Sequence, residues 1–112
     1  MDCLFCKIAN GDIPTNKIYE DDLVLAFNDI DPQAPVHFLV IPKQHIQSVD
    51  FINNENSAIV AHIFEIIAKL AAELNLIDGY RVVTNCGKDG GQSVGHLHFH
   101  VLGKRSLKWP PG

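Results

Sequence analysis

The run from His96 to Leu102 (HLHFHVL) constrains the fold of this chain more than any other segment. Imidazole and apolar side chains alternate along it, which is the pattern of a strand with one buried face. Leu97, Phe99 and Val101 therefore belong to a core, and the three histidines share the opposite face. Three ionisable rings in one row exceed what a solvated polar face or simple packing requires, so this face predicts a functional site.

The spacing of the three histidines limits what they can do together. Residues two apart on a strand have Cα atoms about 6.5 to 7 Å apart, so two neighbouring rings can share one metal ion. The outer pair is about 13 Å apart and cannot share one. At most two of the three rings can therefore bind the same metal, and at least one is left for nucleophilic or acid–base chemistry.

The remaining sequence predicts the element order helix, three strands, helix, two strands. A short helix is expected over Cys3 to Asn10, and a long one from Asn54 to about Leu76, capped by Asn53 or Asn54. The expected strands are Lys17 to Tyr19, Leu23 to Asn28, Val36 to Ile41, Tyr80 to Asn85 and His96 to Leu102. We therefore predict one α+β domain, residues 1–112, whose long helix covers one face of a five-stranded, mainly antiparallel sheet and leaves the other face for function.

Composition excludes several classes of function. The net charge of −4 and the pI near 5.8 give no basic footprint, so a nucleic-acid partner is not expected, although a single nucleotide is compatible with an acidic protein. The amino terminus lacks the pattern of a secretory signal, and charged residues interrupt the apolar stretch from Ile59 to Leu76. We expect a cytoplasmic protein with no membrane partner. Its three cysteines are expected to be reduced thiols, with Cys3 and Cys6 spaced as a metal pair.

Four segments together resemble the histidine triad (HIT) superfamily, and within it the Hint branch. The run from His96 to Leu102 matches the defining motif at every position. The loop from Asp89 to Val94 (DGGQSV), the segment from Asp29 to His45 (DIDPQAPVHFLVIPKQH) and the terminal Trp109 to Gly112 (WPPG) are similar to that branch. The likeness extends over nearly the whole chain.

The resemblance implies a purine nucleoside phosphoramidase that cleaves a P–N bond through a nucleotidyl-histidine intermediate. His98 would be the nucleophile, which requires its other ring nitrogen to donate to a main-chain carbonyl. His100 and His37 would contact the phosphate, and Ser93 would help to protonate the departing amine. The implied nucleotide-binding residues are Asp29, Ile30, Asn85, Gly91, Gln92, Ser93, His98 and His100.

The same resemblance implies a structural zinc ion and a homodimer. Relatives of the zinc-containing microbial type that have the cysteine pair bind the metal with residues matching Cys3, Cys6, His45 and His96. The metal would clamp the amino-terminal helix and take no part in catalysis. The dimer would continue the sheet through the strand at Tyr80 to Asn85, with the tail around Trp109 near the partner's site.

Two alternatives to the phosphoramidase hypothesis remain open at this point. One is hydrolysis of dinucleoside polyphosphates, and the other is a nucleotide-binding or scaffold protein with incidental hydrolysis. The third motif histidine, His100, is not the glutamine of the nucleotidyl-transferase branch, which favours water as the acceptor. Asp31, Cys86 and Gly95 depart from common choices in the family, and the sequence assigns them no role.

Overall fold

The computed structural model describes residues 3–112 and has an α+β architecture around one antiparallel sheet. The elements are α1 (Leu4–Ala9), β1 (Lys17–Glu20), β2 (Val24–Asn28), β3 (Val36–Pro42), a short 3₁₀ helix (Val49–Phe51), α2 (Ser57–Glu73), β4 (Tyr80–Val83) and β5 (Phe99–Gly103). The five strands lie in the order β1-β2-β3-β5-β4, and every neighbouring pair is antiparallel. The predicted fold class and the predicted order of elements are confirmed.

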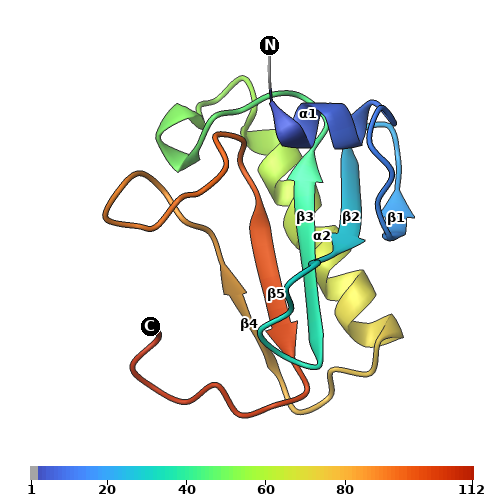
Figure 1. Cartoon of the computed structure of the whole chain (residues 1–112), viewed down its shortest axis with the longest axis vertical. Helices are drawn as coiled ribbons and strands as arrows, with labels where there is room; N and C mark the ends of the chain where they lie inside the picture. Colours follow the sequence, from blue (N-terminus) through green and yellow to red (C-terminus); the bar gives the residue numbers. More distant parts are fainter. Residues whose placement is uncertain (1–2) are drawn as a thin grey trace.

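The long helix α2 covers one face of the sheet (Figure 1). Its apolar stripe, including Ile63 and Leu70, packs on the strand residues that alternate toward it, such as Phe38 and Val40. Leu97, Phe99 and Val101 belong to this same core, as their alternation predicted. The core therefore fixes which side of β5 its histidines occupy.

The long helix is shorter than predicted at both ends. It begins at Ser57, because Asn56 turns its side chain back to accept from the main-chain N–H of Asn53 (2.8 Å) and to donate to the carbonyl of Phe51 (3.0 Å). Those bonds hold the preceding residues in a turn. At the other end Asn75 takes a left-handed conformation (φ 59°), which helical residues do not adopt.

The sequence predicted that the opposite face of the sheet would be left open, but the structure shows that part of this face is covered. Phe5 and Ile8 of α1 pack there on Leu25, Leu39 and Ile41, forming a second buried cluster near one end of the sheet. A helix this short needs tertiary contacts to be stable, and these apolar contacts supply them. His37 shares this face with Leu39, because the two are separated by one residue on β3.

Two strand boundaries near the histidines also differ from prediction. β5 begins at Phe99 and not at His96, because Leu97 donates its N–H to the carbonyl of Ile46 (2.6 Å), beyond the end of β3. β4 ends at Val83, where the hydroxyl of Thr84 donates to the carbonyl of His98 (2.8 Å) in place of a ladder bond. His96 and His98 thus lie just before the strand, and both are buried.

Over residues 3–112, no helix has the length and apolar character needed to cross a membrane.

Candidate active site and metal cluster

A cavity of about 430 Å³ opens between α1, the end of β2 and the segment that carries His98 and His100. Its residues are Leu4, Phe5, Ile8, Ile13, Pro14, Thr15, Phe27, Asn28, Asp29, Ile30, Leu39, Ser93, Val94, His98 and His100. Most of them are apolar, and the polar ones include the two histidines. A cavity of this composition can hold a flat hydrophobic ring on one side and a charged group on the other.

His98 has one ring nitrogen fixed and one free to react. Its Nδ1 lies 2.7 Å from the carbonyl oxygen of His96, an acceptor, so Nδ1 carries the proton. In the neutral ring Nε2 then keeps an unshared electron pair. The Phe5 ring and the imidazole pack in a T-shaped arrangement at a centroid distance of 5.0 Å, which further restricts the orientation of His98. The donor bond to a main-chain carbonyl expected from the sequence is present.

His37 and His100 form a directed pair beside His98. The main-chain N–H of Gln33 donates to Nδ1 of His37 (3.0 Å), so the neutral His37 ring carries its proton on Nε2. That Nε2 lies 2.9 Å from Nδ1 of His100, which must therefore accept. His100 is then protonated on its Nε2. A carboxylate oxygen of Asp29 lies 3.4 Å from Nε2 of His37 as a weaker second acceptor.

His100 is neutral at physiological pH. Burial and the neighbouring rings of His98 and His37 together lower its pKa to about 4, against the opposing charge of Asp29. A neutral His100 can still donate one hydrogen bond from Nε2 to an anionic group. The site therefore offers a nucleophilic ring and a donating ring whose centroids are 5.1 Å apart.

Asp29, His37 and His100 are close enough to resemble a metal site, but their protons argue against one. To ligate a cation, Nε2 of His37 would have to lose its proton, which would then have to sit on Nδ1. That nitrogen already accepts from the N–H of Gln33. A metal here would break that bond, so the three residues are better explained as a hydrogen-bonded group.

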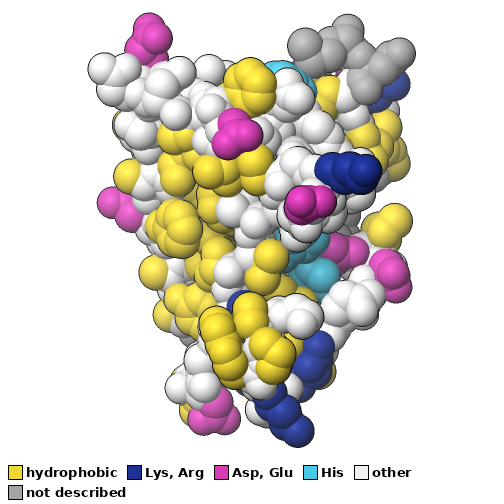
Figure 2. All heavy atoms as spheres, turned by 90° about the vertical axis from the view of Figure 1, so that its left-hand side faces the viewer, with side chains coloured by type: hydrophobic (Ala, Val, Ile, Leu, Met, Phe, Trp, Pro, Cys, Tyr) yellow, Lys and Arg dark blue, Asp and Glu magenta, His cyan; other side chains and the backbone are white. Residues whose placement is uncertain are grey.

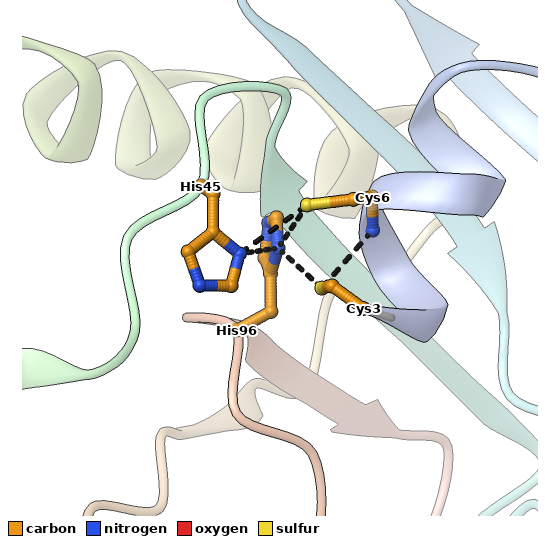
Figure 3. Close-up of side chains that lie close together, drawn as sticks. All are labelled: Cys3, Cys6, His45 and His96. Carbon is orange, nitrogen blue, oxygen red and sulfur yellow. Dashed lines mark hydrogen bonds between the residues drawn. The ribbon is translucent and has the colours of Figure 1, made fainter. Parts of the chain in front are cut away.

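Four other ligand atoms converge at the end of the sheet, as Figure 3 shows. Nδ1 of His96 lies 3.2 Å from the sulfur of Cys3, 3.5 Å from that of Cys6 and 3.2 Å from Nδ1 of His45. The sulfur of Cys6 lies 3.2 Å from Nδ1 of His45. Ligands around a tetrahedral zinc ion are separated by roughly 3.3 to 3.8 Å, given bonds of about 2.0 to 2.3 Å.

The protons of this cluster fit a bound cation. Nε2 of His96 lies 2.8 Å from the carbonyl oxygen of Pro42, so it is the protonated nitrogen and Nδ1 presents its electron pair to the cluster. Burial and the hydrogen bond with Cys3 raise the pKa of the Cys6 thiol to about 11. A cation at this point would reverse that shift, because its charge favours the thiolate. These four residues can therefore hold a metal ion such as zinc.

The metal cluster and the cavity share α1. Cys3 accepts a hydrogen bond from the N–H of Cys6 (3.2 Å) as the helix begins, and between them Leu4 and Phe5 reach the cavity. Sequence reasoning assigned the cysteines to a metal but missed this apolar wall. The signal was the pair Phe5 and Ile8, three apart on a short helix, which marks one buried face.

The structure brings together only part of the nucleotide-binding set expected from the sequence. Asp29, Ile30, Ser93, His98 and His100 line the cavity, and His37 joins them through His100. The other three expected residues lie in the loop between β4 and β5, outside the cavity lining; they are Asn85, Gly91 and Gln92.

That loop satisfies its own polar groups. The amide of Asn85 donates to the carbonyl of Gly90 (2.6 Å), and the side chain of Gln92 accepts from the N–H of Gly87 (3.0 Å). The main-chain N–H of Gly91 donates to the carbonyl of Lys88 (3.1 Å). For these groups to bind an anion, the loop would have to exchange its internal bonds for contacts with the ligand.

Comparison with known proteins identifies the family. A model of the HIT domain matches residues 10–107. The chain is 51% identical over 111 residues to an uncharacterized HIT-like protein of Synechococcus elongatus, covering 99% of this chain and 97% of that protein. This protein belongs to the HIT domain family.

Solved structures agree in fold over the same length. A HIT family hydrolase from Legionella pneumophila Philadelphia 1 is 49% identical, with a TM-score of 0.97 over 99% of this chain and 100% of that one. A histidine triad protein from Clostridium difficile is 54% identical, with a TM-score of 0.93 over 96% of this chain and 95% of the other.

Proposed function

We propose that this protein is a hydrolase of the Hint type, which cleaves the P–N bond of purine nucleoside 5′-phosphoramidates. The observation that carries the proposal is the bond from Nδ1 of His98 to the carbonyl of His96, which leaves Nε2 nucleophilic at the edge of the cavity. The 49% identical HIT family hydrolase with the same fold supports hydrolysis as the reaction class.

The proposed reaction has two displacements at phosphorus. In the first, the electron pair on Nε2 of His98 attacks the α-phosphorus, and the P–N bond to the amine breaks. The amine takes its electron pair and receives a proton from the hydroxyl of Ser93, which lines the same cavity. In the second, water attacks the nucleotidyl-histidine, the bond to Nε2 breaks, and the proton of water returns to Ser93.

The surrounding residues fit the charge and shape of a nucleotide. The N–H on Nε2 of His100 would donate to a phosphoryl oxygen as charge builds in the transition state. One carboxylate oxygen of Asp29 already accepts from the N–H of Asp31 (2.8 Å), and the other would accept from the ribose hydroxyls. The apolar side chains of Leu4 and Phe5, which line the cavity from α1, would pack on the base. Asn85, Gly91 and Gln92 would join the phosphate cradle after the loop opens.

The test compares substrates and variants. Wild type should turn over adenosine phosphoramidate faster than diadenosine polyphosphates, and His98→Ala should abolish turnover of both. His62→Ala is the matched control, because His62 lies on α2 outside the cavity lining and should leave turnover unchanged. Preferential cleavage of diadenosine polyphosphates would favour the alternative hydrolase. Nucleotide binding without any turnover would favour a binding protein.

We further propose that the cluster of Cys3, Cys6, His45 and His96 binds structural zinc. The metal would supply a clamp between α1 and the end of the sheet, and every proposed reaction step uses other groups. Metal analysis of freshly purified, unchelated protein should find about one equivalent of zinc per chain. Less than half an equivalent of any transition metal would contradict this proposal.

We also propose a homodimer that continues the sheet through β4. Within the described chain, β4 is an edge strand with a partner on one side only. Tyr80 on β4 and Phe64 on α2 are 41% and 48% exposed. Figure 2, which faces the β4 side, shows apolar side chains gathered in a band. Such a strand edge favours a second copy, and elution as a 12.4 kDa monomer would overturn the proposal.

A further inference from the structure

A chain of hydrogen bonds runs from the carboxyl-terminal segment to the proposed phosphate site. Nε of Arg105, just after β5, donates to the carbonyl of Gln33 (2.9 Å), although the two residues are 72 positions apart. The N–H of Gln33 donates to Nδ1 of His37, and Nε2 of His37 lies 2.9 Å from Nδ1 of His100. Four residues from two distant stretches of the polypeptide, 33–37 and 100–105, are thus linked by hydrogen bonds.

The first two links have a fixed polarity because each starts from a group that can only donate. Neither a guanidinium nor a main-chain N–H can accept a hydrogen bond. The N–H of Gln33 therefore excludes a proton from Nδ1 of His37 and places it on Nε2. His100 must then accept at Nδ1 and carry its own proton on Nε2. The N–H of Gln33, together with the weaker acceptor Asp29 beside Nε2 of His37, thus favours the tautomer in which His100 donates from Nε2.

We infer that Arg105, acting through the main chain of Gln33, is a positioning residue that sets the proton positions of His37 and His100. The inference rests on the proposed function, in which His100 donates to phosphate. With the opposite tautomer, an electron pair on His100 would face a phosphoryl oxygen and repel it. The same two rings would be present, but the site would lose its donor.

Arg105 matters because Gln33 lies in an exposed loop. The loop joins β2 to β3, and the side chain of Gln33 reaches only back into the same loop, donating to the carbonyl of Asp31 (3.0 Å). The bond from Arg105 ties the loop to a different segment. The guanidinium makes this bond charge-assisted. Without it, the N–H of Gln33 would be free to swing away from His37.

The tautomers can be read directly by long-range ¹⁵N–¹H NMR of the histidine rings, in substrate-free protein. Wild type should show the proton on Nε2 for both His37 and His100. Gln33→Pro removes the decisive N–H, whereas Gln33→Ala keeps it and measures what the side chain alone contributes. Both rings should show mixed tautomers in Gln33→Pro and in Arg105→Ala.

Kinetics on adenosine phosphoramidate give the functional readout. Arg105→Ala should lower kcat about tenfold with little change in KM, the size expected from losing one well-placed hydrogen bond in the transition state. Arg105→Lys, which can still donate to the carbonyl of Gln33, should recover most of that loss. Lys104→Ala is the control, since Lys104 carries the same charge but donates to the carbonyl of Asn75 (2.8 Å), and it should match wild type.

The outcomes separate this inference from the proposed function. If wild type lacks hydrolase activity, the proposed function fails, and the ring spectra still decide whether Arg105 sets the tautomers. Unchanged spectra in Arg105→Ala would overturn the positioning role even in an active enzyme. A fall in kcat for Lys104→Ala equal to that for Arg105→Ala would also overturn it, because it would show a general charge effect. If Gln33→Pro does not fold, the Arg105 variants decide.

Discussion

The contact between His62 of α2 and Asp21 of the β1–β2 turn should make the stability of this protein depend on pH. Nε2 of His62 lies 2.7 Å from a carboxylate oxygen of Asp21, and about a quarter of each side chain is exposed. Burial opposes ionisation of Asp21, but the bonds from His62 and from the main-chain N–H of Leu23 outweigh it and hold the pKa of that carboxyl well below its usual range. The hydrogen bond to Asp21 raises the pKa of His62.

The direction of the pH effect follows from these two shifts. Because the pKa of His62 is raised in the folded protein, the stabilisation is complete below the unfolded pKa of about 6.5 and is lost as pH rises through the folded value. Because the pKa of Asp21 is lowered, its share is present above the unfolded pKa of about 3.9 and is lost as pH falls through the folded value. The pair therefore stabilises the fold most between these limits.

The pair should contribute about 1 kcal/mol to the free energy of unfolding, a value between those of an exposed ion pair and a buried charge-assisted hydrogen bond. His62→Gln should lower the free energy of unfolding by about that amount near pH 6, and by much less near pH 9. Urea unfolding at both pH values measures the difference. Glu65→Gln is the control, because its carboxylate is exposed and 3.7 Å from Nδ1 of His62, and it should have little effect. An equal loss at both pH values for His62→Gln would refute the reasoning.

Three further predictions follow from packing, backbone geometry and the metal cluster. Leu97→Ala should lower the free energy of unfolding by about 3 kcal/mol, because Leu97 is buried. Leu23→Ala, at an exposed site, should change it by under about 0.5 kcal/mol. Similar losses for the two variants in thermal unfolding would contradict the packing account. Gly90→Ala should destabilise the β4–β5 loop, because the added Cβ would clash with the carbonyl oxygen of Cys86. Gly95→Ala is the control, because a Cβ there would lie in open space. Equal rates of proteolysis in the loop for the two variants would contradict this prediction. Zinc affinity should weaken by at least about tenfold for each unit by which pH falls below neutrality, because the metal must displace thiol protons, including that of Cys6. Measured with a competing chelator, Cys6→Ser should lose the metal and Cys86→Ser should keep it.

The sequence predicted those features that depend on local pattern. Alternation along the histidine segment was enough to assign Leu97 to the core, and the spacing argument correctly separated the histidines, since His96 lies in the cysteine cluster and His100 beside Asp29. The element order followed from periodicity, and with it the antiparallel sheet. These are properties of neighbouring residues.

The features that the sequence did not predict depend on contacts between distant residues. β5 starts late because Leu97 bonds to Ile46, and a strand pattern alone cannot show where its partner ends. The link from Arg105 to Gln33 spans 72 residues and has no sequence signature. The packing of Phe5 against His98 depends on where α1 lies on the sheet. The family resemblance was therefore enough to name candidate site residues, but it did not reveal the groups that orient them.

The most direct test of the central claim is to trap the covalent intermediate. Protein mixed with adenosine phosphoramidate, quenched in base within the first turnover and digested with trypsin, should yield the peptide of residues 89–104 with one added AMP group. Fragmentation should locate that group on His98 and not on His96 or His100. An adduct on another residue, or turnover with no covalent adduct at any time, would contradict the account.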